Sequence, residues 1–139
     1  MTSTASLAAP ARPAAPTVGS LLLAGSAATV AAAATTALVA VAGQAVGIST
    51  AVSGASIPPS GFAVLTVIFS VLGLGIAALL RRFARNPRTA WVRTTIALTV
   101  LSFVPDVLAD ATVATKVFLM VTHVVAAAIV IPAVARRLS

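Results

Sequence analysis

Four long apolar runs set the strongest limit on how this chain can fold. The predicted spans cover residues 18–42, 61–80, 90–108 and 113–135. An α-helix rises about 1.5 Å per residue, so about twenty apolar residues cross the roughly 30 Å hydrocarbon core of a membrane. Of the 139 residues, 60% are hydrophobic and only 8% are charged, against about 25% charged in soluble domains. The sequence therefore predicts an all-α fold, a transmembrane four-helix bundle.

The third span is the shortest of the four. Only twelve residues, Thr94 to Pro105, are free of charge, and as a helix they reach about 18 Å. To cross the membrane, this span needs Trp91 at the level of the lipid head groups and Arg93 reaching back toward the basic side. At its other end Asp106 is expected at the interface or slightly within it.

The arginines gather at one set of span ends. One arginine precedes the first span, five lie between the second span and the uncharged stretch that starts at Thr94, two follow the fourth span, and the first connection has no charge. Cytoplasmic segments carry an excess of Lys and Arg, so we expect cytoplasmic N and C termini in a bacterial plasma membrane. Anionic lipid heads are expected partners of the basic connection. The residues predicted to face them are Arg81, Arg82, Arg85 and Arg88.

The segments outside the spans lack a helical apolar face. Residues 1–17 are rich in proline and predict a disordered tail ahead of one membrane domain, residues 18–139. The first span is longer than the apolar core of a usual signal peptide, so we expect it to be retained, with cleavage as the alternative. Residues 43–60 are rich in Gly, Ser, Thr and Pro and predict a loop, with an interfacial segment around residues 45–52.

Composition also limits the chemistry and the partners. The chain has no cysteine, which excludes disulfides, thiolate nucleophiles and cysteine metal sites. Its single histidine has no obvious second ligand, so we expect neither a metal nor another cofactor. The net charge of +7 comes from arginines at span ends rather than from a basic soluble face, so we expect no nucleic-acid partner. Heavy use of Ala, Val, Arg and Pro is typical of a high-GC bacterium.

The only histidine, His123, falls close to the middle of the fourth span. A titratable group inside a span is a functional hypothesis by default, because its burial costs free energy. His123 has two readings: a structural contact with a neighbouring hydroxyl or carbonyl, or a site that handles a ligand or a proton. Each span carries a polar side chain at a similar depth, which predicts a polar layer, unless each hydroxyl bonds its own helix. The predicted layer is Thr29, Ser70, Thr99, Thr122 and His123.

The only two carboxylates, Asp106 and Asp110, stand four residues apart. On a helix they would share a face and could act as acid and base, so Asp106, Asp110 and His123 are the candidate catalytic residues. In the alternative reading, Asp110 caps the fourth helix and Asp106 lies in a turn after Pro105, with Lys116 neutralising either one. Thirteen residues separate Asp110 from His123, about 20 Å along one helix. With Asp106 at the same outer level, we expect neither aspartate to touch His123, which excludes a Ser/His/Asp hydrolase.

Small side chains recur at every fourth position of the first span. Such a ridge allows close approach of another helix, although alanine is common throughout this span. A shorter version occurs in the second span. The predicted helix-packing residues are Ser20, Ala24, Ala28, Ala32, Thr36 and Ala40, together with Gly73 and Ala77.

The C-terminal part resembles an uncharacterised family of small four-span actinobacterial membrane proteins that carry a domain of unknown function. The resemblance rests on Phe103–Asp106, on Thr122–Pro132 and on the ending Ala135–Arg137. It covers roughly residues 60–139 and supports the fold and the membrane location. In the family pattern a histidine also occupies the fourth span, and the resemblance therefore points to His123. The resemblance implies no activity.

The sequence favours a non-enzymatic membrane protein over an enzyme. We expect a small subunit or scaffold that packs with itself or with a partner membrane protein through the first span. The alternative is an integral membrane enzyme or binder that acts on an apolar small molecule through Asp106, Asp110 or His123. A proton-coupled transporter is a weaker third hypothesis, because one titratable group in four spans would need a second copy to form a pathway.

Overall fold

The computed structural model describes residues 17–138, which form four long helices and one short hairpin. Helix α1 covers Val18–Ala45, α2 covers Pro59–Phe83, α3 covers Pro87–Leu108 and α4 covers Val113–Ala135. Strands β1 (Ala51–Val52) and β2 (Ala55–Ser56) pair antiparallel between α1 and α2. All four helices are long and apolar enough to cross a membrane. The predicted all-α transmembrane four-helix bundle is confirmed.

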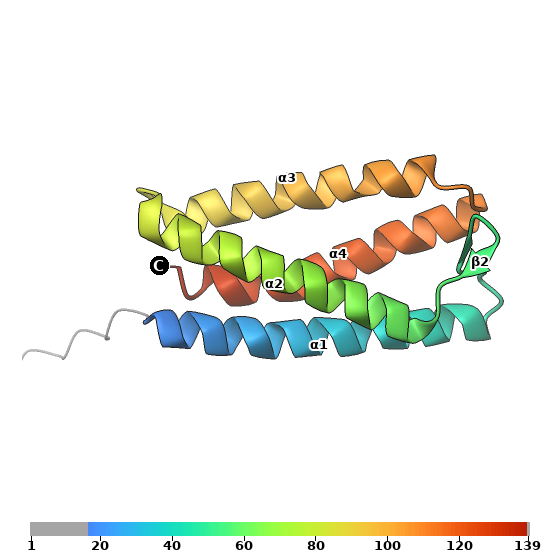
Figure 1. Cartoon of the computed structure of the whole chain (residues 1–139), viewed down its shortest axis with the longest axis horizontal. Coiled ribbons are helices and arrows are strands. Elements are labelled where there is room, and N and C mark those ends of the chain that lie inside the picture. Colours follow the sequence, from blue (N-terminus) through green and yellow to red (C-terminus); the bar gives the residue numbers. More distant parts are fainter. Residues whose placement is uncertain (1–16, 139) are drawn as a thin grey trace, which may run out of the picture.

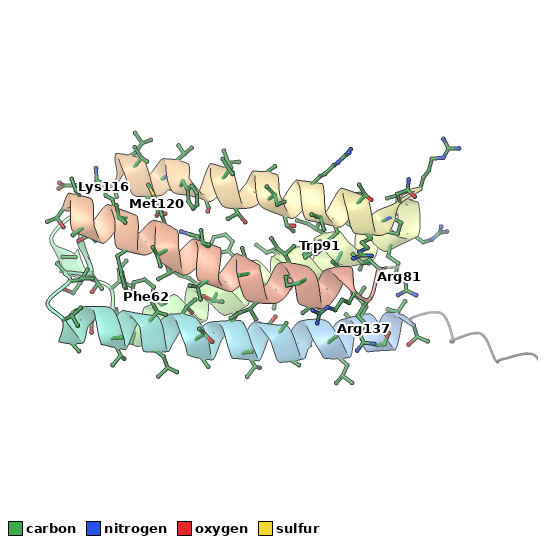
Figure 2. The ribbon with its side chains drawn as sticks, turned by 180° about the vertical axis from the view of Figure 1, so that it is seen from behind. Phe62, Arg81, Trp91, Lys116, Met120 and Arg137 are labelled. Carbon is green, nitrogen blue, oxygen red and sulfur yellow. The ribbon has the colours of Figure 1, made fainter. Side chains whose placement is uncertain are left out.

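The helices run up and down in chain order around the bundle (Figure 1). Helix α1 packs against α2 and α4, and α3 packs against the same two helices from the other side. The start of α1, the α2–α3 connection and the end of α4 share one end of the bundle, while the hairpin and the α3–α4 connection share the other. All described arginines therefore lie toward one end, as Arg81 and Arg137 illustrate in Figure 2. Which end is cytoplasmic stays a prediction.

Polar caps and prolines fix the helix starts. The Thr17 hydroxyl accepts a hydrogen bond from Ser20 N at 3.1 Å, and the Thr112 hydroxyl accepts one from Thr115 N at 3.2 Å. Proline occupies the first turn of α2 and of α3, where its missing N–H has no helical partner to lose. The prediction that Asp110 caps the fourth helix is wrong, because Thr112 does so. Apart from Thr17, the predicted tail lies outside the described residues.

Helix α3 continues through Pro105 to Leu108. The prediction that Asp106 lies in a turn is therefore wrong. Proline removes one backbone hydrogen bond, and spanning helices tolerate this where neighbouring groups satisfy the freed carbonyl. Pro132 stands inside α4 in the same way. As a consequence, Asp106 is helical, and only 7% of its surface is exposed.

The connection after α1 is a β-hairpin rather than the loop and interfacial segment expected from its composition. Ser53 and Gly54 at its tip have φ values of 51° and 81°, the left-handed backbone that a tight hairpin turn requires. Two hydrogen bonds of 2.8 Å tie this region to the α3–α4 end of the bundle: Ser53 N donates to Asp110 O, and the Thr115 hydroxyl donates to Ser49 O. The hairpin thus joins the two connections at this end.

Small side chains let α1 lie close to its neighbours. Ala28, Ala32, Thr36 and Ala40 of the predicted ridge are buried, while Ser20 and Ala24 are half-buried. In the second span, Ala77 is fully buried and Gly73 is half-buried. The ridge therefore faces α2 and α4 of its own chain, which are the helices that contact α1.

Candidate functional site: the Asp106–His123 pair

Asp106 of α3 and His123 of α4 meet across the seam between these two helices. Nδ1 of His123 lies 3.0 Å from Oδ2 of Asp106. The prediction that neither aspartate touches His123 is wrong for Asp106. The chain's only imidazole and one of its two carboxylates thus form a pair inside the predicted membrane domain.

Three features bring the pair together although the sequence places the residues at different depths. Helix α3 includes Asp106 instead of ending before it. Figure 1 shows that α4 begins farther out along the bundle than α3 ends, so the antiparallel helices are staggered. Helical side chains also lean toward the N-terminus of their own helix. In an antiparallel pair these two side chains therefore approach each other along the bundle axis.

The surroundings of Nδ1 indicate which ring nitrogen carries hydrogen in the neutral ring. Nδ1 lies 3.0 Å from the Leu119 carbonyl oxygen as well as 3.0 Å from Asp106 Oδ2. Both neighbours are acceptors, so we infer that Nδ1 carries hydrogen and that Nε2 holds the lone pair. Oδ2 has no aligned hydrogen bond within residues 17–138. Nδ1 therefore lies close to the carboxylate without an aligned hydrogen bond to it, whereas its hydrogen bond to the Leu119 carbonyl is aligned.

Protein covers the carboxylate more fully than the ring. The Asp106 side chain is 9% exposed and the His123 side chain is 37% exposed. The Phe103 ring stands edge-on to the imidazole with centroids 6.4 Å apart. The arrangement thus leaves part of an oriented imidazole uncovered by protein, beside an aromatic ring.

The other charged groups at this end do not join the pair. The Lys116 amine donates to the Val107 carbonyl at 2.8 Å, so it caps the last turn of α3. Asp110 is exposed in the connection between α3 and α4. The structure therefore brings together Asp106 and His123 and leaves Asp110 at the surface.

The hydroxyls of the predicted polar layer bond mainly within their own helices. Thr29 donates to Gly25 O at 2.9 Å, and Thr99 donates to Thr95 O at 2.8 Å. Thr122 donates at 2.7 Å to Leu119 O, the same carbonyl that lies beside His123. Ser70 is buried in α2. His123 is thus linked to this set through a shared carbonyl and not through a hydroxyl.

Two polar contacts between helices were missed at the sequence level. The Thr36 and Thr66 hydroxyls lie 3.0 Å apart and join α1 to α2. The Trp91 ring is 1% exposed, and its Nε1 donates to Ile131 O of α4 at 3.0 Å. The ring thus packs in the bundle core, and its predicted depth at the level of the lipid head groups stays a prediction. A signal existed for Thr66, which stands four residues before Ser70 and so near its helix face.

Comparison with known proteins identifies the family of this chain but gives no activity. A search of curated proteins and a search of solved structures each gave no significant match. One family model matches residues 16–139, so the similarity includes α1 and is wider than the C-terminal resemblance indicated. Since the match covers nearly the whole chain, the protein belongs to the family of unknown function DUF6069.

Proposed function

We propose that the protein is a multi-pass protein of a bacterial plasma membrane that binds a small apolar molecule at the Asp106–His123 pair. The observation that carries this proposal is the contact of 3.0 Å between Nδ1 and the buried carboxylate. The Leu119 carbonyl accepts the hydrogen on Nδ1 and the Asp106 carboxylate lies beside it, which leaves Nε2 as an acceptor. A ligand that carries a hydrogen-bond donor and dissolves in lipid could reach this ring.

The neighbouring groups favour a ligand of this kind. The imidazole is 37% exposed, and the Phe103 ring stands beside it. An apolar body can therefore pack on Phe103 while a hydroxyl or amide of the ligand donates to Nε2. A hydrogen bond made away from water is worth more than the same bond in water, because the local dielectric is low.

Binding is favoured over catalysis because the site offers one base and its orienting carboxylate. Asp110, the other candidate acid, is exposed in the connection between α3 and α4. A reaction by acid and base would need a second titratable group near the first. An enzyme that recruits such a group from its substrate remains the alternative form of this proposal. Proton-coupled transport is the weaker form, because it needs a pathway beyond this pair.

A second proposal is that the protein is a small subunit or scaffold. The exposed outer face of α2 supports it, rather than a particular site. Helix α2 buries only Phe62, Ser70 and Ala77, so most of its outer surface is covered by lipid or by another protein. The α1 ridge faces its own bundle, so such assembly would use the outer faces of α2 or α3. The abundance of Ala, Val, Arg and Pro supports a high-GC bacterial source, the resemblance supports an actinobacterial one, and the axial separation of charges supports cytoplasmic termini.

Extraction in mild detergent tests the binding proposal. The wild type, His123→Leu, Asp106→Leu and the matched control Asp110→Leu are purified, checked for helix content, and their bound small molecules identified by mass spectrometry. We expect wild type and Asp110→Leu to retain an apolar compound that the other two retain about tenfold less, the effect of one lost hydrogen bond. Identical extracts from four folded proteins would contradict the proposal, and a co-purified protein shared by all four would favour a scaffold.

A further inference from the structure

An open, shallow cavity lies on the outer surface of α3 alone, at its arginine end and away from the Asp106–His123 pair. It has a volume of about 350 Å³ and is lined by Arg88, Thr89, Val92 and Arg93. Two guanidinium groups and one hydroxyl are groups that bind phosphate oxygens, and guanidinium groups do so in a bidentate manner. The lining therefore suits a phosphate-bearing anion.

The charge around this cavity is of one sign. Within residues 17–138 both carboxylates belong to the hairpin end of the bundle, while the described arginines belong to the end of the cavity. Arg88 also stands in the first turn of α3, where the partial positive charge of a helix start disfavours a cation. An anion between Arg88 and Arg93 would offset the repulsion between the like-charged arginines and the repulsion between Arg88 and the helix start.

An apolar stripe leads away from the cavity along α3. Val92, Ile96 and Val100 follow Arg88 at intervals of four residues, and Ile96 and Val100 are 53% and 60% exposed. The stripe from Arg88 to Val100 is about 18 Å long, slightly more than half of the roughly 30 Å hydrocarbon core. One acyl chain in one leaflet could therefore lie along it.

From these two observations we propose that α3 carries a binding site for an anionic phospholipid. The phosphate group of the lipid occupies the cavity between Arg88 and Arg93, and the Thr89 hydroxyl donates a further hydrogen bond. An acyl chain lies on Ile96 and Val100. The stripe is the reason to choose a lipid over free phosphate, which would use only the cavity. The site adds Thr89 and Arg93 to the arginines predicted to face head groups, and it does not depend on the proposed ligand of His123.

The single tryptophan provides the test, since Trp91 belongs to the same helical turns as the cavity. The full chain is placed in phosphatidylcholine vesicles that contain increasing amounts of phosphatidylglycerol with brominated acyl chains, and Trp91 fluorescence is measured. Brominated phosphatidylcholine provides the reference for lipid that meets α3 by chance. We expect phosphatidylglycerol to quench at a several-fold lower mole fraction.

Two variants with equal charge loss separate a site from general attraction. Arg88→Gln/Arg93→Gln removes the two guanidinium groups of the cavity, and Arg136→Gln/Arg137→Gln removes two others from the same end. A basic residue near anionic lipid contributes about a fivefold change in binding. General attraction alone would lower the preference equally in the two variants, by up to about 25-fold. We expect the cavity variant to lose several-fold more than the control.

Three outcomes would overturn the proposal. Equal losses in the two variants would mean that only the overall charge attracts anionic lipid. An equal response to brominated phosphatidylcholine would mean that no head group is selected. Full relief of quenching by added inorganic phosphate at the concentration of the lipid would assign the cavity to a soluble phosphate, whereas no relief is expected for a lipid held also by its acyl chain.

Discussion

Asp106 and Asp110 are both aspartates and stand four positions apart, but the bundle places them in different surroundings. Asp106 lies 3.0 Å from His123 and is 7% exposed, whereas Asp110 is exposed in a connection. Removing a charge from water costs free energy that only good partners offset. The pair is therefore expected to be coupled, while Asp110 is expected to act alone.

This coupling leads to a prediction about stability. His123→Leu leaves a buried carboxylate without its ring partner, and we expect it to lower the free energy of unfolding by about 1–3 kcal/mol. Asp106→Leu/His123→Leu should recover part of this loss, because no carboxylate then remains buried and unpaired. Unfolding in a titration with sodium dodecyl sulfate, followed by circular dichroism, measures both. Losses that simply add in the double variant would show that the two side chains do not interact.

The sequence was enough to predict the candidate chemical residues, but it did not predict the contact between Asp106 and His123. An imidazole within an apolar run and two carboxylates at its border stand out by composition alone. Their contact depends on the helical state of Asp106, on the stagger of α3 against α4, and on the lean of both side chains. These are properties of packing, and no local pattern around Asp106 or His123 encodes them.

At the level of the helix, glycine permits two close approaches to α1. A Cβ atom added to Gly43 would lie 2.6 Å from the Phe118 ring, and one added to Gly25 would lie 2.5 Å from Leu74. By contrast, a Cβ atom added to Gly75 meets nothing within 4 Å. The same substitution therefore has opposite consequences at different positions of the bundle.

Gly43→Ala is expected to destabilise the bundle by about 1–3 kcal/mol, the usual cost of forcing extra volume into a packed core. The matched control Gly75→Ala should be neutral or stabilising by up to about 1 kcal/mol, because alanine is the better helix former. Thermal unfolding of both variants in detergent provides the comparison. If Gly43→Ala is as stable as Gly75→Ala, α1 and α4 are not in the contact described.

The α3–α4 seam has a second polar link toward the arginine end. Trp91 Nε1 donates to Ile131 O at 3.0 Å. Trp91→Phe keeps a ring in the core and removes the donor, so we expect a loss of about 0.5–1.5 kcal/mol in unfolding free energy. The exposed residue Phe83 supplies a control, since Phe83→Leu should change stability by less than about 0.5 kcal/mol. Similar losses from both changes would contradict the role of this hydrogen bond.

The number and approximate positions of the helices were predictable, because hydropathy shows directly how long each apolar segment is. The failures came where local signals misled. Pro105 suggested a turn, yet α3 continues through it, and the uncharged connection after α1 suggested a loop where a hairpin forms. Proline is a weaker helix breaker within a membrane than in water, and two-residue strands are too short to show an alternating pattern.

On the scale of the whole molecule, charge is separated along the bundle axis. The described arginines lie in the last turn of α2, in the α2–α3 connection, in the first two turns of α3 and directly after α4. The hairpin shares the opposite end with the α3–α4 connection. For this arrangement the positive-inside tendency predicts four spans with cytoplasmic termini. The order of the helices around the bundle was not predictable, because each apolar run could have packed on any other.

Single cysteines test the threading, since the chain has none of its own. Ala55→Cys in the hairpin is expected to react with a membrane-impermeant maleimide added to intact cells. Arg85→Cys should react only after the cells are permeabilised. Labelling of position 85 from outside, with position 55 protected, would reverse the orientation proposed for the arginine end.

The measurement that bears most directly on the central claim is the distance between Asp106 and His123 in a lipid bilayer. The full chain is produced with carbon-13 aspartate and nitrogen-15 histidine, which label two carboxyl groups and one imidazole. Solid-state NMR should show strong dipolar coupling between one carboxyl carbon and a protonated Nδ1. This coupling should survive Asp110→Asn and disappear in Asp106→Asn. Absence of coupling in the wild type, or its loss in Asp110→Asn, would contradict the account.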